Sequence, residues 1–319
     1  MAVNFFVQTD LDFRANTFGP LTEFKFLNPP LGPSATVTLN GSQFAPFGLF
    51  FPVKFNGNSG VNGVLVYGNS NIIRADTWFM VNWSPQDTVT LLAAATGKAI
   101  IYGSAVADKV IGGSKADVLK SGAGNDTITG GGSGDFLYGG SGLDTVNYSG
   151  RGAITVNLAT GTASDGDELT DFENVIGSFL SDHITGSAGV NDLRGGGGAD
   201  TLVGGGGLDV LLGGSGADHF RFLATSDAPS FRINDIIADF SKRQGDVIDL
   251  SVIDANGLLR GDTFDFIGTG LFSGTAGELR YFTTAAATFI EADVTGDGVA
   301  DMRIRLTGVH TLDANDFML

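Results

Sequence analysis

Acidic residues recur every nine positions in two stretches of this chain, and this period constrains the fold more than any other feature. Glycines cluster before each of these residues, and an apolar residue follows two positions after it. A repeat of this regularity predicts a solenoid in which equivalent positions stack on one another. The repeated residues are Asp108, Asp117, Asp126, Asp135 and Asp144, and then Asp182, Asn191, Asp200, Asp209 and Asp218.

The unit from Gly139 to Asn147 shows how the period becomes structure. Its glycines permit turn conformations with positive φ, so its first six residues predict a tight loop. Val146 lies between Thr145 and Asn147, which predicts a very short strand with one inward side chain. Two units then form one flattened coil with a loop at each edge. We expect Asp108, Asp126 and Asp144 to stack along one edge, and Asp117 and Asp135 along the other.

Columns of carboxylates on stacked strands, about 4.8 Å apart, require counter-ions. Each neighbouring pair repels by about 1 kcal/mol in water and by several times more at a lower effective dielectric constant. The loops offer carboxylate and carbonyl oxygens without sulfur or imidazole at the repeat positions, and such hard oxygen ligands suit Ca²⁺ best. If three sites form between coils in each array, about six calcium ions bind.

These features give residues 103–147 and 177–221 a resemblance to the calcium-binding repeats of RTX (repeats-in-toxin) proteins. The resemblance implies a calcium-bound parallel β-roll or β-helix. The match is uneven, because Lys115 and Ser133 replace a loop glycine and Asn191 replaces an aspartate. We expect such units to bind weakly or to serve as edges. A flexible glycine-rich linker is the alternative, and without calcium we expect disorder.

Residues from about 210 to the end resemble the C-terminal domain of serralysin-type secreted metalloproteases. The resemblance rests on residues 235–240, 246–254, 293–301 and 306–319. It implies an uncleaved secretion signal at residues 316–319, read by a type I secretion machinery, although an ordinary terminal strand explains these residues equally well. The zinc motif His-Glu-x-x-His is absent, since the histidines are His183, His219 and His310. We therefore expect no protease activity.

Residues 293–301 contain a second pattern of oxygen side chains. Asp293, Thr295 and Asp297 alternate as in an EF-hand loop, but Ile304 stands where the twelfth-position acid would be. A complete EF-hand is excluded. A partial calcium loop of Asp293, Asp297 and Asp301 and a polar turn between strands both remain open.

Charge and composition limit the partners. The net charge is −17, and residues 1–100 contribute none of it, with five acids and five bases. An acidic surface argues against nucleic acid as a partner. The chain has no cysteine, no apolar run long enough to span a membrane, and no basic and apolar start typical of a signal peptide.

The predicted fold class is all-β, in three regions. We expect a β-rich, sandwich-like domain at 1–100, the β-roll at 101–222 with its two arrays joined by 148–176, and a serralysin-like β cap with the secretion signal at 223–319. Residues 77–83 hold both tryptophans on a predicted strand, either as core or as a platform for sugars.

The sequence predicts a secreted, extracellular calcium-binding protein that folds on calcium binding after type I export. Its expected role is that of a matrix, adhesion or interaction protein, with polysaccharide or a host surface as partner. The alternative is a glycan-active lyase or epimerase within residues 1–100. A remnant of a protease that lost its catalytic half is a third possibility.

Overall fold

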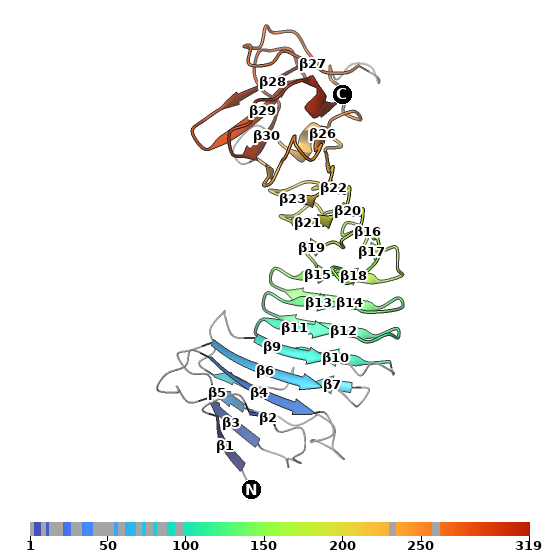
Figure 1. The fold of residues 1–319 in the computed structure, drawn as a ribbon, viewed down its shortest axis with the longest axis vertical. Coiled ribbons are helices and arrows are strands. Elements are labelled where there is room, and N and C mark those ends of the chain that lie inside the picture. Colours follow the sequence, from blue (N-terminus) through green and yellow to red (C-terminus); the bar gives the residue numbers. More distant parts are fainter. Residues whose placement is uncertain are drawn as a thin grey trace. The chain divides into compact units, whose positions relative to one another are not determined.

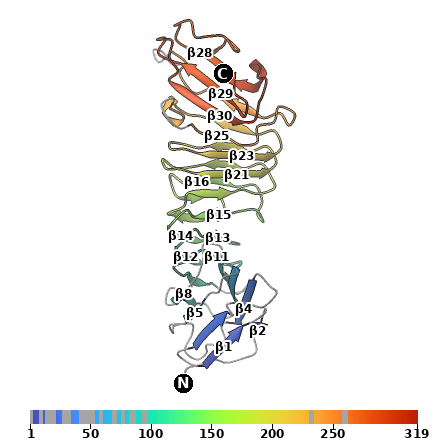
Figure 2. The same cartoon turned by 90° about the vertical axis from the view of Figure 1, so that its left-hand side faces the viewer.

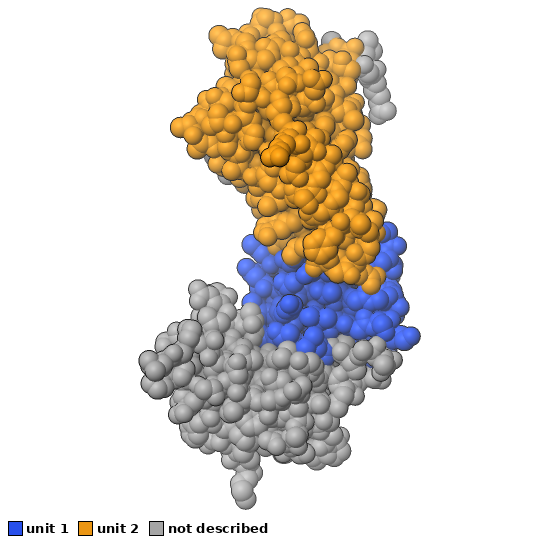
Figure 3. Space-filling model, in the orientation of Figure 1, with its two compact units in different colours: residues 1–147, 162–172 blue, residues 148–161, 173–319 orange. Residues whose placement is uncertain are grey.

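The computed structural model describes residues 98–229, 234–256 and 262–319 in full, and the strands between Val3 and Leu92 mainly as backbone. The chain divides into two compact units (Figure 3). Unit 1 comprises residues 1–147 and 162–172, and unit 2 comprises residues 148–161 and 173–319. The described residues contain no α-helix, only the 3-10 helices η2 (Thr225–Asp227) and η3 (Ala314–Asp316). None of these helices is long and apolar enough to cross a membrane.

Unit 1 is built from three sheets whose strands are parallel except for the antiparallel pair β17 and β18 (Figure 1). The first sheet has the order β1 (Val3–Val7), β3 (Thr22–Phe26), β5 (Lys54–Asn56) and β8 (Phe79–Val81). The second has the order β2 (Leu11–Asp12), β4 (Ser34–Asn40), β6 (Val61–Tyr67), β9 (Thr88–Leu92), β11 (Asp108–Ile111), β13 (Thr127–Thr129) and β15 (Thr145–Asn147). The third has the order β7 (Ile72–Arg74), β10 (Ile100–Tyr102), β12 (Val118–Ala123), β14 (Phe136–Ser141), β18 (Glu168–Thr170) and β17 (Thr162–Ala163).

The strands of the first hundred residues pair in parallel, both with one another and with the repeats. β6 pairs with β9 and β9 with β11, so that Val66, Leu91 and Val110 are in register. β7 pairs in the same way with β10. Strands on both sides of residue 100 therefore share sheets, a detail that the expectation of a sandwich-like domain did not contain. Of the predicted tryptophan strand, only the backbone of β8 is described, and the tryptophans lie outside the described residues.

Unit 2 continues the repeat pattern and ends in an antiparallel cap (Figure 2). One sheet has the order β16 (Thr155–Asn157), β20 (His183–Thr185), β22 (Thr201–Val203), β24 (His219–Arg221), β26 (Val247–Asp249) and β31 (Phe317–Met318), all parallel. The other has the order β19 (Asn174–Ile176), β21 (Asp192–Gly197), β23 (Val210–Ser215), β25 (Ile236–Ile237), β30 (Met302–Thr307), β29 (Ala287–Asp293), β28 (Glu278–Thr283) and β27 (Asp265–Phe266). In this sheet β28, β29 and β30 pair antiparallel.

Each repeat contributes one apolar side chain to the core, as the nine-residue pattern predicts. The apolar residue two positions after each repeat aspartate is fully buried. Because successive coils align these positions, the inward side chains stack in columns between the two sheets that the repeats form in each unit. The predicted all-β class with a parallel solenoid is confirmed. The buried residues are Val110, Leu119, Ile128, Leu137, Val146, Ile184, Leu193, Leu202, Leu211 and Phe220.

The segment that interrupts the repeats supplies further coils. In unit 1, β18 pairs in parallel with β14 and places Leu169 in register with Leu137. In unit 2, β16 pairs in parallel with β20 and places Val156 in register with Ile184. The interruption therefore lengthens individual coils without ending the stack in either unit, because the inward apolar positions stay aligned.

Candidate metal centre

The repeat aspartates form hydrogen-bonded ladders along the edges of each unit. The Oδ1 atom of one aspartate accepts the backbone N–H of the repeat residue one coil earlier. In unit 1 this N–H to Oδ1 distance is 2.8 Å from Asp108 to Asp126 and 2.7 Å from Asp117 to Asp135. Along the same edge as Asp108, the N–H of Asp126 donates to Asp144 at 2.8 Å. The two edges predicted from the sequence are thus present in unit 1.

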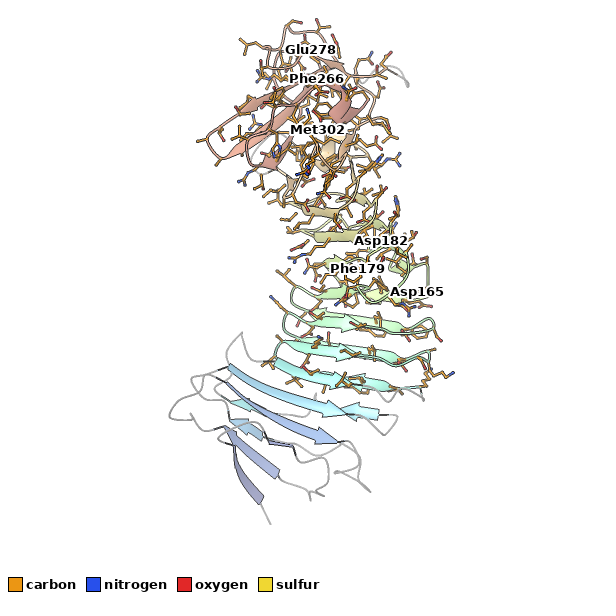
Figure 4. The ribbon with its side chains drawn as sticks, in the orientation of Figure 1. Asp165, Phe179, Asp182, Phe266, Glu278 and Met302 are labelled. Atoms are coloured by element: carbon orange, nitrogen blue, oxygen red, sulfur yellow. The ribbon has the colours of Figure 1, made fainter. Side chains whose placement is uncertain are left out.

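Unit 2 repeats this arrangement. The N–H of Asp182 donates to Oδ1 of Asp200 at 2.7 Å, and the N–H of Asp200 donates to Oδ1 of Asp218 at 2.9 Å. Along the other edge, the N–H of Asn191 donates to Oδ1 of Asp209 at 2.8 Å. Asp182, labelled in Figure 4, lies in the loop immediately before β20.

Three aspartates that the sequence analysis missed extend these ladders. Asp167 accepts the N–H of Asp135, Asp235 that of Asp209, and Asp246 that of Asp218, at 2.8, 2.9 and 3.2 Å. They break the nine-residue spacing because the loops before them are longer. Their signal was the apolar residue two positions later, which is buried in each case: Leu169, Ile237 and Ile248.

The first coil of each array differs from the coils that follow, because its own loop caps its acidic side chain. In these loops the backbone N–H four residues earlier donates to the side chain. Ser104 donates to Oδ2 of Asp108 at 2.5 Å, and Gly113 to Oδ2 of Asp117 at 2.7 Å. The equivalent bonds in unit 2 run from Ser178 to Asp182 at 2.5 Å and from Ser187 to Asn191 at 2.8 Å.

Most later coils leave the second carboxylate oxygen without a partner, although Oδ2 of Asp246 accepts the N–H of Ser241 at 2.8 Å. In the nine-residue repeats among them, the loop residue four positions before the aspartate is a glycine with positive φ, such as Gly131 at 105° and Gly196 at 112°. Only glycine adopts this conformation readily, and no hydrogen bond joins the N–H of these glycines to the aspartate that follows them. Among the described residues, the buried Oδ2 atoms without a hydrogen-bond partner include those of Asp126, Asp135, Asp200, Asp209, Asp218 and Asp235.

Burial of these carboxylates opposes their ionisation. Loss of hydration raises the pKa to about 7 for Asp135, Asp200 and Asp235, and to about 6 for Asp209 and Asp218. The backbone N–H that each Oδ1 accepts lowers the pKa, but less than burial raises it. Neighbouring carboxylates raise it further. The metal-free fold thus holds several acids that a bound cation would keep ionised.

These oxygens fit calcium. The Oδ2 atoms of Asp135, Asp200, Asp209 and Asp218 each lie against the first glycine of their own loop, and at Gly195 a backbone oxygen of the next coil lies there as well. At Gly195, a Cβ would lie 2.2 Å from Oδ2 of Asp200 and 2.7 Å from the carbonyl oxygen of Gly213. At Gly130, it would lie 2.5 Å from Oδ2 of Asp135 and 3.1 Å from Oδ2 of Asp167. Carboxylate and carbonyl oxygens from adjacent coils therefore converge, which is the donor chemistry that Ca²⁺ takes.

Backbone oxygens are necessary to such a site. Within the described residues, no three His, Cys, Asp or Glu side chains gather closely enough to hold a metal. A cation held by the ladders therefore needs carbonyl oxygens besides the carboxylates. The aspartates with unpartnered oxygens would hold calcium together with glycine carbonyls, and the ion would neutralise their charge. Asp108, Asp117, Asp182 and Asn191 have fewer acceptor sites left for a metal, because their own loops cap them.

The loop at residues 293–301 is held by its own carboxylates. Asp293 is fully buried and accepts the N–H groups of Gly296 and Gly298 at 2.7 and 2.8 Å. Asp301 accepts the N–H groups of Val294 and Thr295 at 2.8 and 2.9 Å. These bonds stabilise a turn between β29 and β30 without a metal and favour the polar-turn interpretation. Calcium binding by Asp293, Asp297 and Asp301 stays a prediction.

Fold and ladders together define a calcium-binding β-roll, and comparison with known proteins places the chain in a family. The family described as Peptidase M10 serralysin C terminal matches residues 136–319, more than half of the chain. The RTX calcium-binding nonapeptide repeat matches residues 111–146. The chain belongs to the Peptidase M10 serralysin C-terminal family and carries RTX calcium-binding repeats. The matched regions include no protease domain.

Several solved structures match this chain, and one of them is an epimerase subunit. It is the AlgE6R3 subunit from the Azotobacter vinelandii mannuronan C5-epimerase, which is 29% identical over 45% of this chain and 80% of that chain. The TM-score is 0.26, so the likeness carries no structural argument. No curated protein matches this chain.

The amount by which calcium stabilises the fold is expected to vary with pH. Because the folded, metal-free pKa values lie near 6 to 7, above the unfolded value of 3.8, protonation stabilises the metal-free fold. That stability is complete below about pH 4 and is lost as the pH rises through 6 to 7. Protons also compete with calcium for the same oxygens. The difference in urea midpoint between calcium-loaded and calcium-depleted protein should therefore shrink as the pH falls from 8 to 5. A constant difference over this range would contradict the assignment of these carboxylates to calcium.

Proposed function

We propose that this protein is exported unfolded by a type I secretion machinery and folds outside the cell when calcium binds. There it acts as a matrix, adhesion or interaction protein. The observation that carries this proposal is the set of buried carboxylate oxygens without partners along both edges of the repeats. The match of residues 111–146 to the RTX calcium-binding repeat supports calcium as the cation that these oxygens bind.

The energetics support a switch between unfolded and folded states. A buried carboxylate with one oxygen unpaired is costly, so a fold holding six such Oδ2 atoms is unfavourable at neutral pH without a cation. Extracellular calcium modules bind with dissociation constants of about 10⁻⁴ to 10⁻³ M, far above the calcium concentrations of a cytosol. Because the sites exist only in the folded chain, their binding free energy is folding free energy.

The C-terminal residues give a second reason for export before folding. In the folded chain, β31 pairs with β26, and Phe317 is only 7% exposed. Lys242 lies 2.7 Å from a carboxylate oxygen of Asp313 and 2.8 Å from one of Asp316. A signal at residues 316–319 would thus be partly covered after folding, with Asp316 and Phe317 buried and Met318 43% exposed, and fully accessible before it. Folding outside the cell also prevents return through the exporter.

The enzymatic alternative stays a hypothesis from the sequence. It needs catalytic side chains within residues 1–100, and up to Thr88 these side chains lie outside the described residues. The described part of this region from Val89 onward contributes strands and core residues such as Val89, Leu91 and Ala99.

Export can be tested in a bacterial host with and without a type I exporter. We expect the full chain in the medium only when the exporter is present, and a chain ending at Thr311 in the cells under both conditions. Medium protein should gain β structure when calcium is added. Retention of the full chain in cells that carry the exporter would overturn export by this route. Release that persists without residues 312–319 would place the signal elsewhere.

A further inference from the structure

The charges of residues 98–147 are distributed unlike those of the rest of the chain. All five acids of this segment are repeat aspartates, and all are buried. Its basic residues are four lysines, all exposed: Lys98, Lys109, Lys115 and Lys120. Calcium at the aspartates would cancel the buried negative charge and leave the exposed positive charge. In a protein of net charge −17, the surface of this segment is therefore cationic.

Aromatic rings flank one of these lysines on the outward face of the third sheet of unit 1. Tyr102, Lys120 and Tyr138 occupy equivalent positions on β10, β12 and β14, which are neighbours in Figure 1. The Nζ atom of Lys120 lies 4.7 Å from the ring centre of Tyr138 and 5.9 Å from that of Tyr102. Phe136, two residues before Tyr138 on β14, is 38% exposed. We call these four residues the aromatic strip.

We propose that the aromatic strip binds a linear acidic polysaccharide, with Lys120 pairing a sugar carboxylate and the rings stacking on sugar faces. The negative face of an aromatic ring attracts the C–H groups of a pyranose ring, as it attracts the lysine ammonium. Successive coils present one such group about every 4.8 Å, a spacing similar to the length of one sugar along a chain. This inference rests on the proposed extracellular role, in which calcium has neutralised the aspartates beneath the strip.

Charge favours a uronate polymer over a nucleic acid. A strand of nucleotides draws most of its affinity from many basic contacts along its backbone, and the aromatic strip offers only Lys120. A short uronate segment needs one carboxylate near Lys120 and ring contacts on either side. The strip also has a defined end, because the exposed Glu168 on β18 is in register with Phe136 and repels an acidic polymer there. The bound segment should therefore lie over β10, β12 and β14.

Binding can be measured by titrating the full chain, folded in calcium, with mannuronate oligomers too short to gel with calcium. Lys120→Gln should weaken binding about tenfold, which corresponds to about 1.4 kcal/mol. Tyr138→Ala should weaken it by a similar factor. The matched control is Lys109→Gln, an exposed lysine on β11 in the other sheet of the repeats, which should bind like the unmodified chain. Circular dichroism in calcium checks that each variant is folded.

Four other results of these titrations would contradict either the proposed binding site or the proposed function. Equal weakening by Lys120→Gln and Lys109→Gln would show general attraction of a polyanion and overturn the site. Tighter binding of single-stranded DNA than of the uronate would overturn the choice of polysaccharide. No binding by a chain that folds with calcium would overturn this inference and leave the proposed function intact. A chain that does not respond to calcium at all would instead contradict the proposed function.

Discussion

Removing calcium is expected to abolish most of the β-sheet signal of this protein in far-UV circular dichroism, and returning calcium should restore it cooperatively. At a hundredfold excess over the dissociation constant, each site contributes about 2.7 kcal/mol to the stability of the folded state. Several such sites exceed the roughly 5–15 kcal/mol by which a domain is usually stable. The buried Oδ2 atoms without partners are therefore the reason why we expect the metal-free fold to fail at neutral pH.

Magnesium is the control for this experiment. It prefers a smaller octahedral site and keeps its waters, so loops of glycine carbonyls and carboxylates should not fold around it. We expect no change of the spectrum at magnesium concentrations for which calcium gives full folding. A β spectrum that persists in a calcium-free buffer at neutral pH would contradict the folding switch, even though the family assignment would stand.

Replacement of one repeat glycine by alanine is expected to destabilise the calcium-loaded fold by about 3 kcal/mol or more. Gly214 has φ +98°, and a Cβ there would lie 2.2 Å from the carbonyl oxygen of Gly196 in the adjacent coil. The Cβ is fixed rigidly to the backbone and the oxygen belongs to it, so neither can move without disturbing the stack of coils. Gly214→Ala should therefore lower the urea midpoint in saturating calcium and raise the calcium concentration needed for folding.

Gly152→Ala is the matched control within the same unit. A Cβ at Gly152 would meet no atom within 4 Å, and its φ is not positive. Its stability should stay within about 0.5 kcal/mol of the unmodified chain. Equal urea midpoints for Gly214→Ala and Gly152→Ala would show that the coils tolerate a side chain at the turn. That result would contradict the close approach of the backbones of Gly214 and Gly196.

The nine-residue period predicted much of the site because it fixes both spacing and chemistry. A strict repeat places equivalent residues above one another, so Asp108 and Asp126 had to share an edge and Val110 had to point inward. Hard oxygen donors without cysteine or repeat histidine left calcium as the expected cation, and the family match supports it. The local sequence was enough to predict these contacts, because neighbours in the fold are separated by a constant number of residues in the chain.

The nine-residue period did not predict the ladder residues where the loops vary in length. Asp167, Asp235 and Asp246 continue the ladders, but they lie 32, 26 and 28 residues after their partners. A nine-residue spacing therefore cannot predict that these three aspartates belong to the ladders. Their place is set by β18, β25 and β26, which align with the preceding coils through buried Leu169, Ile237 and Ile248.

By itself, the sequence determined the parallel solenoid, its inward residues and the oxygen chemistry of its edges, because these follow from a period that every coil repeats. Only the tertiary structure decided which carboxylates are capped and which are left without partners. That division depends on the backbone conformation of one loop residue: Ser178 donates its N–H to Asp182, whereas Gly196, with positive φ, leaves Oδ2 of Asp200 buried and unpaired. A conformation of this kind is set by the coils packed on either side.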